Sequence, residues 1–405
     1  MNYYPQTCVW EVTMGCNMNC GHCGSSCKYP LPGELTSAEA LSFVDMCVDM
    51  NLKWVTLSGG EPLTRSDICS IIKYCKQKGL AANIITNGWL MTDDLAKKLK
   101  SSGVSTVAIS LDGTEEVHDK IRKKGSFERI KNAFHILKKY DIFTASITTI
   151  SNLNIALLGE IKDFLISMGV DVWQLQIGLP MGNFSKHPDW LIKPDKIIDI
   201  IDFCYDAAVE GKIGICLADC MGYYSRKQIE IDKIYLRSKN IPLWDGCHAG
   251  IRSFGMLHNG DILGCTSIRD KKFIEGNIRE KTLREIWESP DTFLWRRNFT
   301  KEMLDGNCKV CKYSKKCLGG CTNTRLAINK DINSDNKYCT HSILMDKFRN
   351  QLASRVDSEN ILNHAKNMIN QKCYQEANLS LDRLIELEPE NSDFKNLKNF
   401  THSII

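Results

Sequence analysis

Short apolar runs alternate with amphipathic segments of helical length over the first 180 residues, and this alternation restricts the possible folds most strongly. We expect strands at 8–14, 54–58, 82–86, 106–110, 143–149 and 172–177. We expect helices between them, at 37–50, 65–78, 93–102, 126–139 and 155–168. Such alternation predicts an α/β fold with a parallel sheet covered by helices. Six units predict a partial (β/α)6 TIM-like barrel, whose chemistry lies in the loops that follow the strands.

The character of the sequence changes after the sixth expected strand. We expect the barrel over 1–185, a bridging region over 186–240, a small cysteine-rich α+β domain over 241–345, and a short helical tail over 346–405. Within the tail, residues 367–391 resemble one helix–turn–helix of a tetratricopeptide repeat, with Pro389 after the second helix. A single repeat cannot bury its own apolar face, so it is expected to pack on the body, on another subunit or on a partner.

Cysteine is unusually abundant, with 19 residues among 405, whereas 43% hydrophobic and 25% charged residues are ordinary values. A net charge of +4 without a basic block argues against nucleic acid or an acidic membrane surface as partners. No signal peptide or membrane-spanning run is recognisable, so we expect a cytoplasmic protein. In that compartment clustered cysteines bind metal or react. Scattered thiols are expected to be small buried hydrophobes, among them Cys47, Cys69, Cys75 and Cys204.

Three cysteines, Cys16, Cys20 and Cys23, share one short loop after the first expected strand, in TMGCNMNCGHC. Thiolates suit iron and sulfide, and a four-iron cube held by three cysteines keeps one iron open for a small molecule. A structural zinc site, with Cys27 close behind, and three buried thiols are the alternatives.

Glycine-rich and polar segments follow the next strands. LSGGEPL presents Gly59, Gly60, Glu61 and Pro62, where glycines allow close approach of a ligand and exposed acceptors can hold an ammonium group. ITNG ends the third strand, and ISLDG ends the fourth and places Ser110 to reach a ribose or a carboxylate. Taken together, residues 8–180 resemble the radical S-adenosylmethionine superfamily.

This resemblance implies that the open iron chelates S-adenosylmethionine and that the bound cofactor yields a 5′-deoxyadenosyl radical, while the protein positions it. It further implies that the GGEP segment binds the amino group of the cofactor and that Arg122 binds its carboxylate, a contact suited to arginine. The alternative for Arg122 is a solvated helix residue. In the sixth strand, Leu175 is expected against the adenine, with Gln176 pointing into the barrel.

Seven more cysteines lie in the cysteine-rich part: Cys247, Cys265, Cys308, Cys311, Cys317, Cys321 and Cys339. Seven thiols predict two metal sites, one of them with a non-cysteine or vacant position, and zinc remains open by spacing alone. Their order resembles the SPASM domain, as do GNIREKTLREIW and CLGGC. The resemblance implies two auxiliary [4Fe–4S] clusters, one bound by Cys247, Cys265 and Cys321 and the other by Cys308, Cys311, Cys317 and Cys339. The fourth iron of the first auxiliary cluster would stay open or would bind His248 or a substrate thiolate.

With three [4Fe–4S] clusters, one binding S-adenosylmethionine and two auxiliary, the reaction is expected to be an oxidation. A substrate radical that forms a bond must lose one electron, which a nearby cluster can accept. The resemblance implies a radical SAM oxidoreductase that matures a ribosomally made peptide through a thioether or C–C cross-link. The alternatives are an anaerobic sulfatase maturase, which forms formylglycine, and a non-catalytic zinc-binding scaffold.

The sulfatase alternative needs a base near the barrel mouth, for which Asp219 in CLADCMGYY is the candidate catalytic residue. Cys216 and Cys220 are further candidates or core thiols. The expected partners are a precursor peptide or protein and an electron donor such as flavodoxin or ferredoxin. Because the first strand begins near residue 8, leader recognition is expected from a separate protein, the bridging region or the tail.

Overall fold

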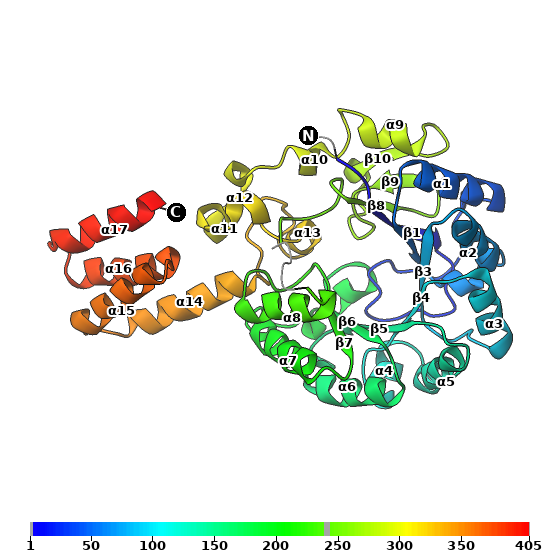
Figure 1. Cartoon of the computed structure of the whole chain (residues 1–405), viewed down its shortest axis with the longest axis horizontal. Helices are drawn as coiled ribbons and strands as arrows, with labels where there is room; N and C mark the ends of the chain where they lie inside the picture. The colour runs from blue at the N-terminus through cyan, green and yellow to red at the C-terminus, as the bar shows by residue number, and fades with distance from the viewer. Residues whose placement is uncertain (1–2, 239–243, 405) are drawn as a thin grey trace.

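A computed structural model of the chain describes residues 3–238 and 244–404 (Figure 1). Seven parallel strands form a curved sheet in chain order, which confirms the expected partial barrel. They are β1 (Thr7–Thr13), β2 (Trp54–Gly59), β3 (Ala81–Thr86), β4 (Thr106–Ser110), β5 (Thr144–Ile150), β6 (Val172–Ile177) and β7 (Gly214–Leu217). The seventh strand lies in the expected bridging region, and its four residues are too few to produce a recognisable period.

Helices cover the outer face of the curved sheet, as Figure 1 shows. They are α1 (Ser37–Asp49), α2 (Ile68–Gln77), α3 (Asp93–Ser102), α4 (Glu115–Ile121), α5 (Ser126–Lys139), α6 (Leu158–Ser167), α7 (Lys196–Glu210) and α8 (Arg226–Leu236). Helix α1 begins at a capping box between Thr36 and Glu39, as its sequence predicts. Trp10 of β1 and Phe43 of α1 pack edge to face in the core between these layers, with ring centroids 5.1 Å apart.

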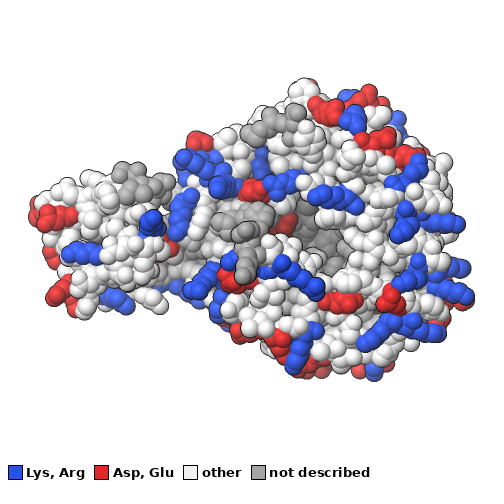
Figure 2. Space-filling view, in the orientation of Figure 1, with Lys and Arg blue, Asp and Glu red and all other residues white. Residues whose placement is uncertain are grey.

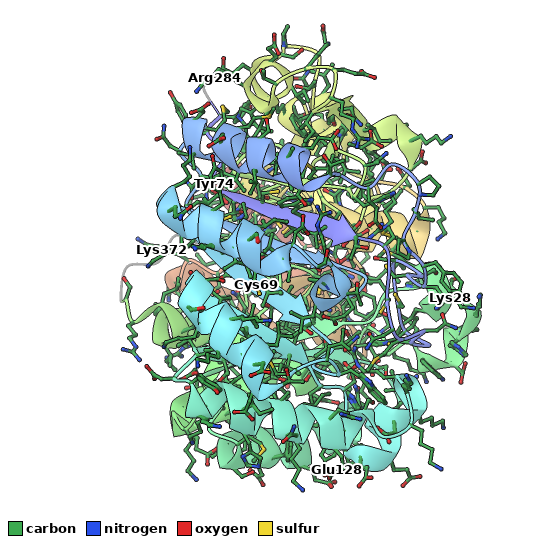
Figure 3. The ribbon with its side chains drawn as sticks, turned by 90° about the vertical axis from the view of Figure 1, so that its right-hand side faces the viewer. Lys28, Cys69, Tyr74, Glu128, Arg284 and Lys372 are labelled. Atoms are coloured by element: carbon green, nitrogen blue, oxygen red, sulfur yellow. The ribbon has the colours of Figure 1, made fainter. Side chains whose placement is uncertain are left out.

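The scattered cysteines mostly take the expected buried positions. Cys47, Cys75 and Cys204 are buried in the apolar core, whereas Cys69 is only half-buried on the outer side of α2 (Figure 3). The difference follows from helix period, because Cys75 shares the inward face of α2 with Ile68, Ile71 and Ile72, and Cys69 does not.

The cysteine-rich part extends the barrel sheet. Its strand β8 (Ser253–Met256) pairs in parallel with β1, from Thr7 opposite Ser253 to Trp10 opposite Met256. The strands β9 (Asp261–Leu263) and β10 (Ile274–Asn277) follow antiparallel, so that one sheet of ten strands runs through both parts. The short helices are α9 (Leu283–Glu288), α10 (Leu294–Arg297), α11 (Gly306–Val310), α12 (Ser314–Cys317) and α13 (Thr322–Asn329). This pairing holds the later cysteines beside the barrel.

Four helices form the tail, which projects away from the barrel in Figure 1: α14 (Thr340–Ala353), α15 (Ser358–Asn370), α16 (Tyr374–Leu387) and α17 (Ser392–Ile404). The expected pair within 367–391 corresponds to α15 and α16, although its first helix begins earlier, at Ser358. The tail has its own apolar core, around Ile361, Leu381 and Leu384. It also contacts the cysteine-rich part, where Lys312 Nζ lies 3.4 Å from Glu376 Oε1 of α16. Within the described ranges, no helix has the length and apolarity that crossing a membrane requires.

Candidate active site

A cavity of about 400 Å³ lies inside the curve of the sheet, at the ends of the parallel strands. Its lining includes Cys16, Cys20, Cys23, Gly59, Gly60 and Ser110, so residues far apart in the sequence meet as expected. Figure 2 shows a hollow on this part of the surface. In Figure 3, Lys28 of the loop after β1 lies at the edge toward which that strand points. The site therefore occupies the edge at which parallel barrels carry their chemistry.

The three thiols of the first group differ in acidity. Burial raises the pKa of Cys16 to about 11 and also raises that of Cys20. The Cys27 thiol donates a hydrogen bond to Cys23 and lowers the pKa of Cys23. Cys27 is itself buried, with its sulfur 3.9 Å from the sulfur of Met14. Metal ligation needs thiolates, and this arrangement makes Cys23 the most easily ionised of the three.

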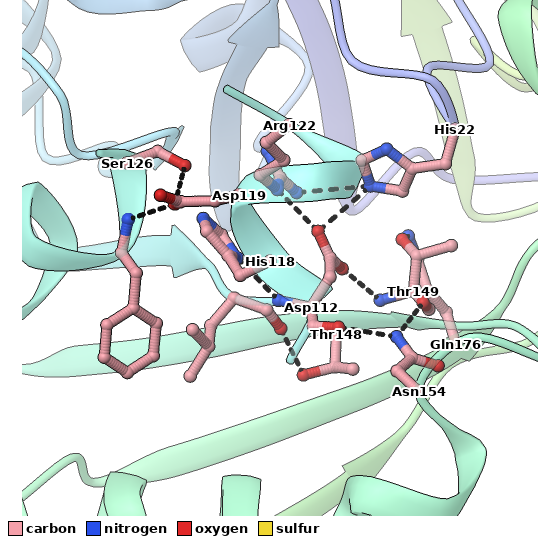
Figure 4. A network of polar contacts seen from close by, with 12 residues as sticks. His22, Asp112, His118, Asp119, Arg122, Ser126, Thr148, Thr149, Asn154 and Gln176 are labelled. Atoms are coloured by element: carbon pink, nitrogen blue, oxygen red, sulfur yellow. Dashed lines mark hydrogen bonds and ion pairs between the residues drawn. The ribbon is translucent and has the colours of Figure 1, made fainter. Parts of the chain in front are cut away.

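A buried charge network fixes one side of the cysteine loop (Figure 4). Asp112 Oδ2 lies 2.5 Å from Arg122 Nε and 3.1 Å from His22 Nε2, and His22 belongs to the loop itself. The other carboxylate oxygen of Asp112 accepts from the Thr149 amide at 2.9 Å. Burial alone would raise the pKa of Asp112, but the charges of Arg122 and His22 outweigh it and hold that pKa well below its usual range. The loop is thereby tied to the ends of β4 and β5.

Asn183 and Asn87 hold the cysteine loop from two other sides. The Asn183 backbone amide donates to Cys23 O at 2.8 Å, and its side chain donates to Cys20 O at 3.1 Å. Asn87, at the end of β3, donates to Asn17 Oδ1 at 2.7 Å. The sequence pattern missed His22 and Asp112, although both stand inside motifs that it identified. No sequence signal indicated Asn183, because it lies in a short 3₁₀-helix, Gly182–Lys186, about 160 positions later in the chain.

The cysteine-rich part also reaches the loop. Arg269 forms an ion pair with Glu11 of β1 and donates to Ser25 Oγ. Glu11 is buried, and burial raises its pKa while Arg269 opposes the rise. Both residues line the cavity, so this pair joins the two parts of the chain at the site.

The GGEP turn needs glycines because its backbone passes very close to the backbone of the cysteine loop. A Cβ on Gly60 would lie 2.1 Å from Gly15 O, and a Cβ on Gly59 would lie 2.3 Å from Thr13 O. Gly59 also has a φ of 123°, which side chains rarely adopt. The turn therefore lies directly against the cysteine loop, held by hydrogen bonds such as Glu61 N to Gly15 O at 2.8 Å.

Glu61 is not the exposed acceptor that the sequence suggested. It is fully buried, and its carboxylate accepts from Thr86 Oγ1 and the Asn87 amide, each at 2.7 Å, and from the Leu63 amide at 3.1 Å. These contacts join the ends of the second and third strands, while Pro62, which is buried, begins a turn of 3₁₀-helix. Gly59 and Gly60 line the cavity, so the backbone is what this turn offers to a ligand there.

Arg122 lines the cavity but is not a solvated helix residue, since Asp112 engages its guanidinium. The expectation for Leu175 is wrong. Its side chain is fully buried in the apolar core, while Gln174 and Gln176 line the cavity from the opposite face of β6. Neighbouring residues of a strand point to opposite faces, so Gln176 inside requires Leu175 outside.

Of the seven later cysteines, Cys321 lies near Cys247 and Cys265, and Cys317 lies near Cys308 and Cys311. Burial raises the pKa of Cys321, and Cys247, Cys220 and Cys265 raise it further. Likewise, burial raises the pKa of Cys317 to about 12, with Cys308 and Cys311 adding to the shift. The second group, completed by Cys339, lines a separate small cavity together with Tyr223, Tyr224 and Tyr313.

Asp219 follows β7 and lies near His248 and Cys265 rather than in the lining of the barrel cavity. Its side chain is accessible to solvent, yet protein surrounds it closely enough that desolvation raises its pKa, and His248 opposes the rise. The next residue, Cys220, does line the cavity. Across the described residues, no three His, Cys, Asp or Glu side chains are grouped as ligands of a single metal ion.

Comparisons with known proteins agree with this site. The radical SAM superfamily model matches residues 10–165, and the SPASM model, an iron–sulfur cluster-binding domain, matches residues 247–318. The chain is 31% identical over 350 residues to the AdoMet-dependent heme synthase of Methanosarcina barkeri, covering 84% of this chain and 98% of that protein. It is 26% identical over 335 residues to the mycofactocin maturase MftC of Mycolicibacterium smegmatis, covering 78% of each.

Solved structures share the fold. SuiB of Streptococcus suis, bound to S-adenosylmethionine, has a TM-score of 0.67 at 18% identity, covering 84% of this chain and 77% of that one. The AdoMet-bound anSMEcpe has a TM-score of 0.65 at 19% identity, covering 82% and 94%. The family models and the 31% identity to the heme synthase of M. barkeri show that the chain belongs to the radical SAM superfamily. Within this superfamily, the chain is an enzyme of the SPASM type. It uses S-adenosylmethionine and [4Fe–4S] clusters, and its SPASM domain provides auxiliary cluster binding.

Proposed function

We propose that this enzyme oxidises its substrate by hydrogen abstraction and that Cys16, Cys20 and Cys23 hold the cluster that binds S-adenosylmethionine. The fit is good because three thiols of one loop line a single cavity, and the backbone of Gly59 and Gly60 borders the same space. When bound, the cluster and S-adenosylmethionine supply a carbon radical that abstracts hydrogen. The protein's part is to orient the reactants and exclude water.

Particular residues have separate roles in this proposal. The backbone of Gly59 and Gly60 receives the amino group of the cofactor, while Glu61 acts only as a buried anchor for the turn. Ser110 and Gln176 line the cavity and offer hydrogen bonds to a ribose or to the substrate. Arg122 keeps positive charge beside Cys20, which stabilises thiolate there.

Oxidation is favoured by one observation in particular. The barrel cavity is lined by Thr266 and Ser267, which follow Cys265, and by Asn323, close to Cys321. The first auxiliary group therefore lies next to the space in which a substrate radical would form. We propose two auxiliary clusters, with Cys247, Cys265 and Cys321 at the first and Cys308, Cys311, Cys317 and Cys339 at the second. The nearer cluster would take the electron that the substrate loses.

For the substrate, we propose a side chain of a ribosomally made peptide, which the enzyme oxidises to a thioether or C–C cross-link. An open hollow admits one side chain while the rest of a long chain stays outside (Figure 2). The similarity to MftC, a maturase, supports this class. The proposed partners are the precursor peptide, a reductant such as flavodoxin or ferredoxin, and a separate leader-binding protein. Formylglycine formation is less favoured, because Asp219, its expected base, does not line the cavity.

A porphyrin is the second candidate substrate. The heme synthase of M. barkeri aligns over nearly its whole length at 31% identity, higher than the identity to MftC. In this case the enzyme would oxidise a side chain of an iron porphyrin with the same radical and the same auxiliary clusters.

The test uses anaerobically purified protein, reduced with dithionite in the presence of S-adenosylmethionine. Three four-iron clusters predict about twelve irons per chain and formation of 5′-deoxyadenosine. Short peptides encoded near the gene are then compared with Fe-coproporphyrin III as substrates by mass spectrometry. A peptide that loses two hydrogens supports the first candidate, and haem supports the second. Zinc without iron, or iron without cofactor cleavage, would refute the proposal.

A further inference from the structure

The two auxiliary groups differ by one cysteine. Four thiols that line one small cavity form the group of Cys308, whereas the resemblance to the SPASM domain assigns only Cys247, Cys265 and Cys321 to the other. Each of the four irons in a [4Fe–4S] cube takes one ligand outside the cube, so the first group is one ligand short. If the proposed function is correct, either one iron stays open or a residue from elsewhere in the fold supplies the ligand.

Cys220 lies where a fourth ligand of the first auxiliary group is needed. It lies in the loop after β7 and lines the barrel cavity together with Thr266 and Asn323, which flank Cys265 and Cys321. The loop that carries it contacts Cys321 directly, since Tyr223 of that loop accepts a hydrogen bond from the Cys321 amide at 2.9 Å. No cysteine spacing in the sequence reveals this, because 100 residues separate Cys220 from Cys321.

Three hydrogen bonds fasten the Cys220 loop to the cysteine-rich part. Thr324 Oγ1 donates to Cys220 O at 3.3 Å, and the Cys321 amide donates to Tyr223 Oη at 2.9 Å. The Thr340 amide donates to Gly222 O at 2.8 Å. The loop is therefore held against the residues that follow Cys321 and Cys339.

The backbone of this loop is strained. Tyr223 and Tyr224 have φ values of 81° and 56°, a region that residues with a Cβ adopt at a cost of roughly 1–3 kcal/mol each. Both tyrosines are buried beside Cys317, with Trp244 and Tyr313 packed against them. Such conformations persist only where the surroundings enforce them, and here they hold the loop against both cysteine groups.

Neighbouring groups are less suited to the vacant position. His248 Nε2 lies 3.1 Å from Asp245 Oδ1, and its ring stacks on Trp244. The Cys216 thiol interacts with Tyr235. Asp219 offers a carboxylate, which suits an iron–sulfur cluster less well than a thiolate does. Of these groups, Cys220 is the thiol that lines the cavity together with Thr266 and Asn323.

We propose that Cys220 is the fourth ligand of the first auxiliary cluster, beside Cys247, Cys265 and Cys321. This inference rests on the proposed function. It makes that cluster fully thiolate-bound, so the substrate does not coordinate to it and the cluster serves as an electron acceptor. The ligand comes from the loop after β7, the last barrel strand, and this loop ties the cluster to the part of the fold that holds the radical site.

The test uses full-length protein in which Cys16, Cys20 and Cys23 are alanine, so that only the auxiliary clusters contribute. This background is expected to hold about eight irons, and cyanide should leave its reduced EPR spectrum unchanged, because no iron is open. Adding Cys220→Ala should remove up to four irons or make one EPR signal respond to cyanide. The matched control, Cys204→Ala, removes a buried thiol of α7 in the main apolar core and should change neither readout.

Cys220→Ser is the second variant, and it guards against a loss of folding. Serine keeps the side-chain size and offers an oxygen ligand, so iron should be retained while one EPR signal shifts. Unchanged iron and EPR in both Cys220 variants, or a background spectrum that already responds to cyanide, would overturn the inference. A background without any iron would instead refute the proposed function, so the two failures can be told apart.

Discussion

Arg122 donates from Nε to Asp112 Oδ2 across 2.5 Å, and the two side chains expose only 10% and 0% of their surfaces. The same carboxylate oxygen lies 3.1 Å from His22 in the loop that carries Cys16, Cys20 and Cys23. The pair therefore joins the end of β4 to the cysteine loop. Because both charges are buried, each depends on the other for compensation.

Replacing Arg122 with methionine should destabilise the protein by about 3 kcal/mol or more, because it leaves Asp112 buried without its main partner. Chemical denaturation followed by circular dichroism measures the change. Lys131→Met is the control, since Lys131 pairs with Glu128 on the surface and should cost no more than about 0.5 kcal/mol. Equal losses in the two variants would contradict this account.

Stability should depend on pH through Asp112. Its pKa is lower in the folded chain than in the unfolded chain, so its contribution is present above the unfolded value and is lost as pH falls toward the folded value. The free-energy difference between wild type and Asp112→Asn should therefore shrink below about pH 4, the ordinary pKa of aspartate. Urea titrations between neutral and acid pH test this, and a difference that does not vary with pH would count against it.

Gly60→Ala should disrupt the site. The added Cβ would lie 2.1 Å from Gly15 O, and neither backbone segment can move without shifting the cysteine loop. We expect a loss of about 2 kcal/mol or more and reduced iron content. Gly159→Ala in α6, where a Cβ meets nothing within 4 Å, should be neutral or slightly stabilising. If Gly60→Ala retains iron and stability as Gly159→Ala does, the close approach is unimportant.

Replacing Cys16, Cys20 and Cys23 together with alanine should abolish formation of 5′-deoxyadenosine and lower the iron content by about four. Liquid chromatography of the reduced reaction mixture measures the first and colorimetric iron analysis the second. Residual 5′-deoxyadenosine from the triple variant would show that the assignment of these residues is wrong.

Cys339→Ala should separate cofactor cleavage from product formation. Cys339 belongs to the group of Cys308, away from the barrel cavity, so some 5′-deoxyadenosine should still form while the oxidised product is lost. Both compounds can be quantified in one mass-spectrometric run. A variant that makes product at the wild-type rate would remove the second group from the proposed electron path.

Elements with strong periodic signals could be predicted from the sequence. The six apolar runs are strands in the structure, and the cysteine loop and the GGEP turn meet as expected at their ends. The four-residue strand β7 could not be predicted, because so short a segment carries no period. Leu175 shows why the two faces of a strand are hard to assign from sequence. An error of one position exchanges the residues that face the cavity for those that face the core.

The sequence by itself determined the fold class and the first cysteine loop, because local spacing and alternation carry that information, whereas the grouping of the seven later cysteines is implied by the resemblance to the SPASM domain. Only the tertiary structure decided that β8 pairs with β1, that Asn183 and Arg269 hold the cysteine loop, and that the loop of Cys220 lies against the segment of Cys321. Those relations join segments separated by about 100 residues or more. They arise from how the sheet curves and packs, which the pattern along the chain does not record.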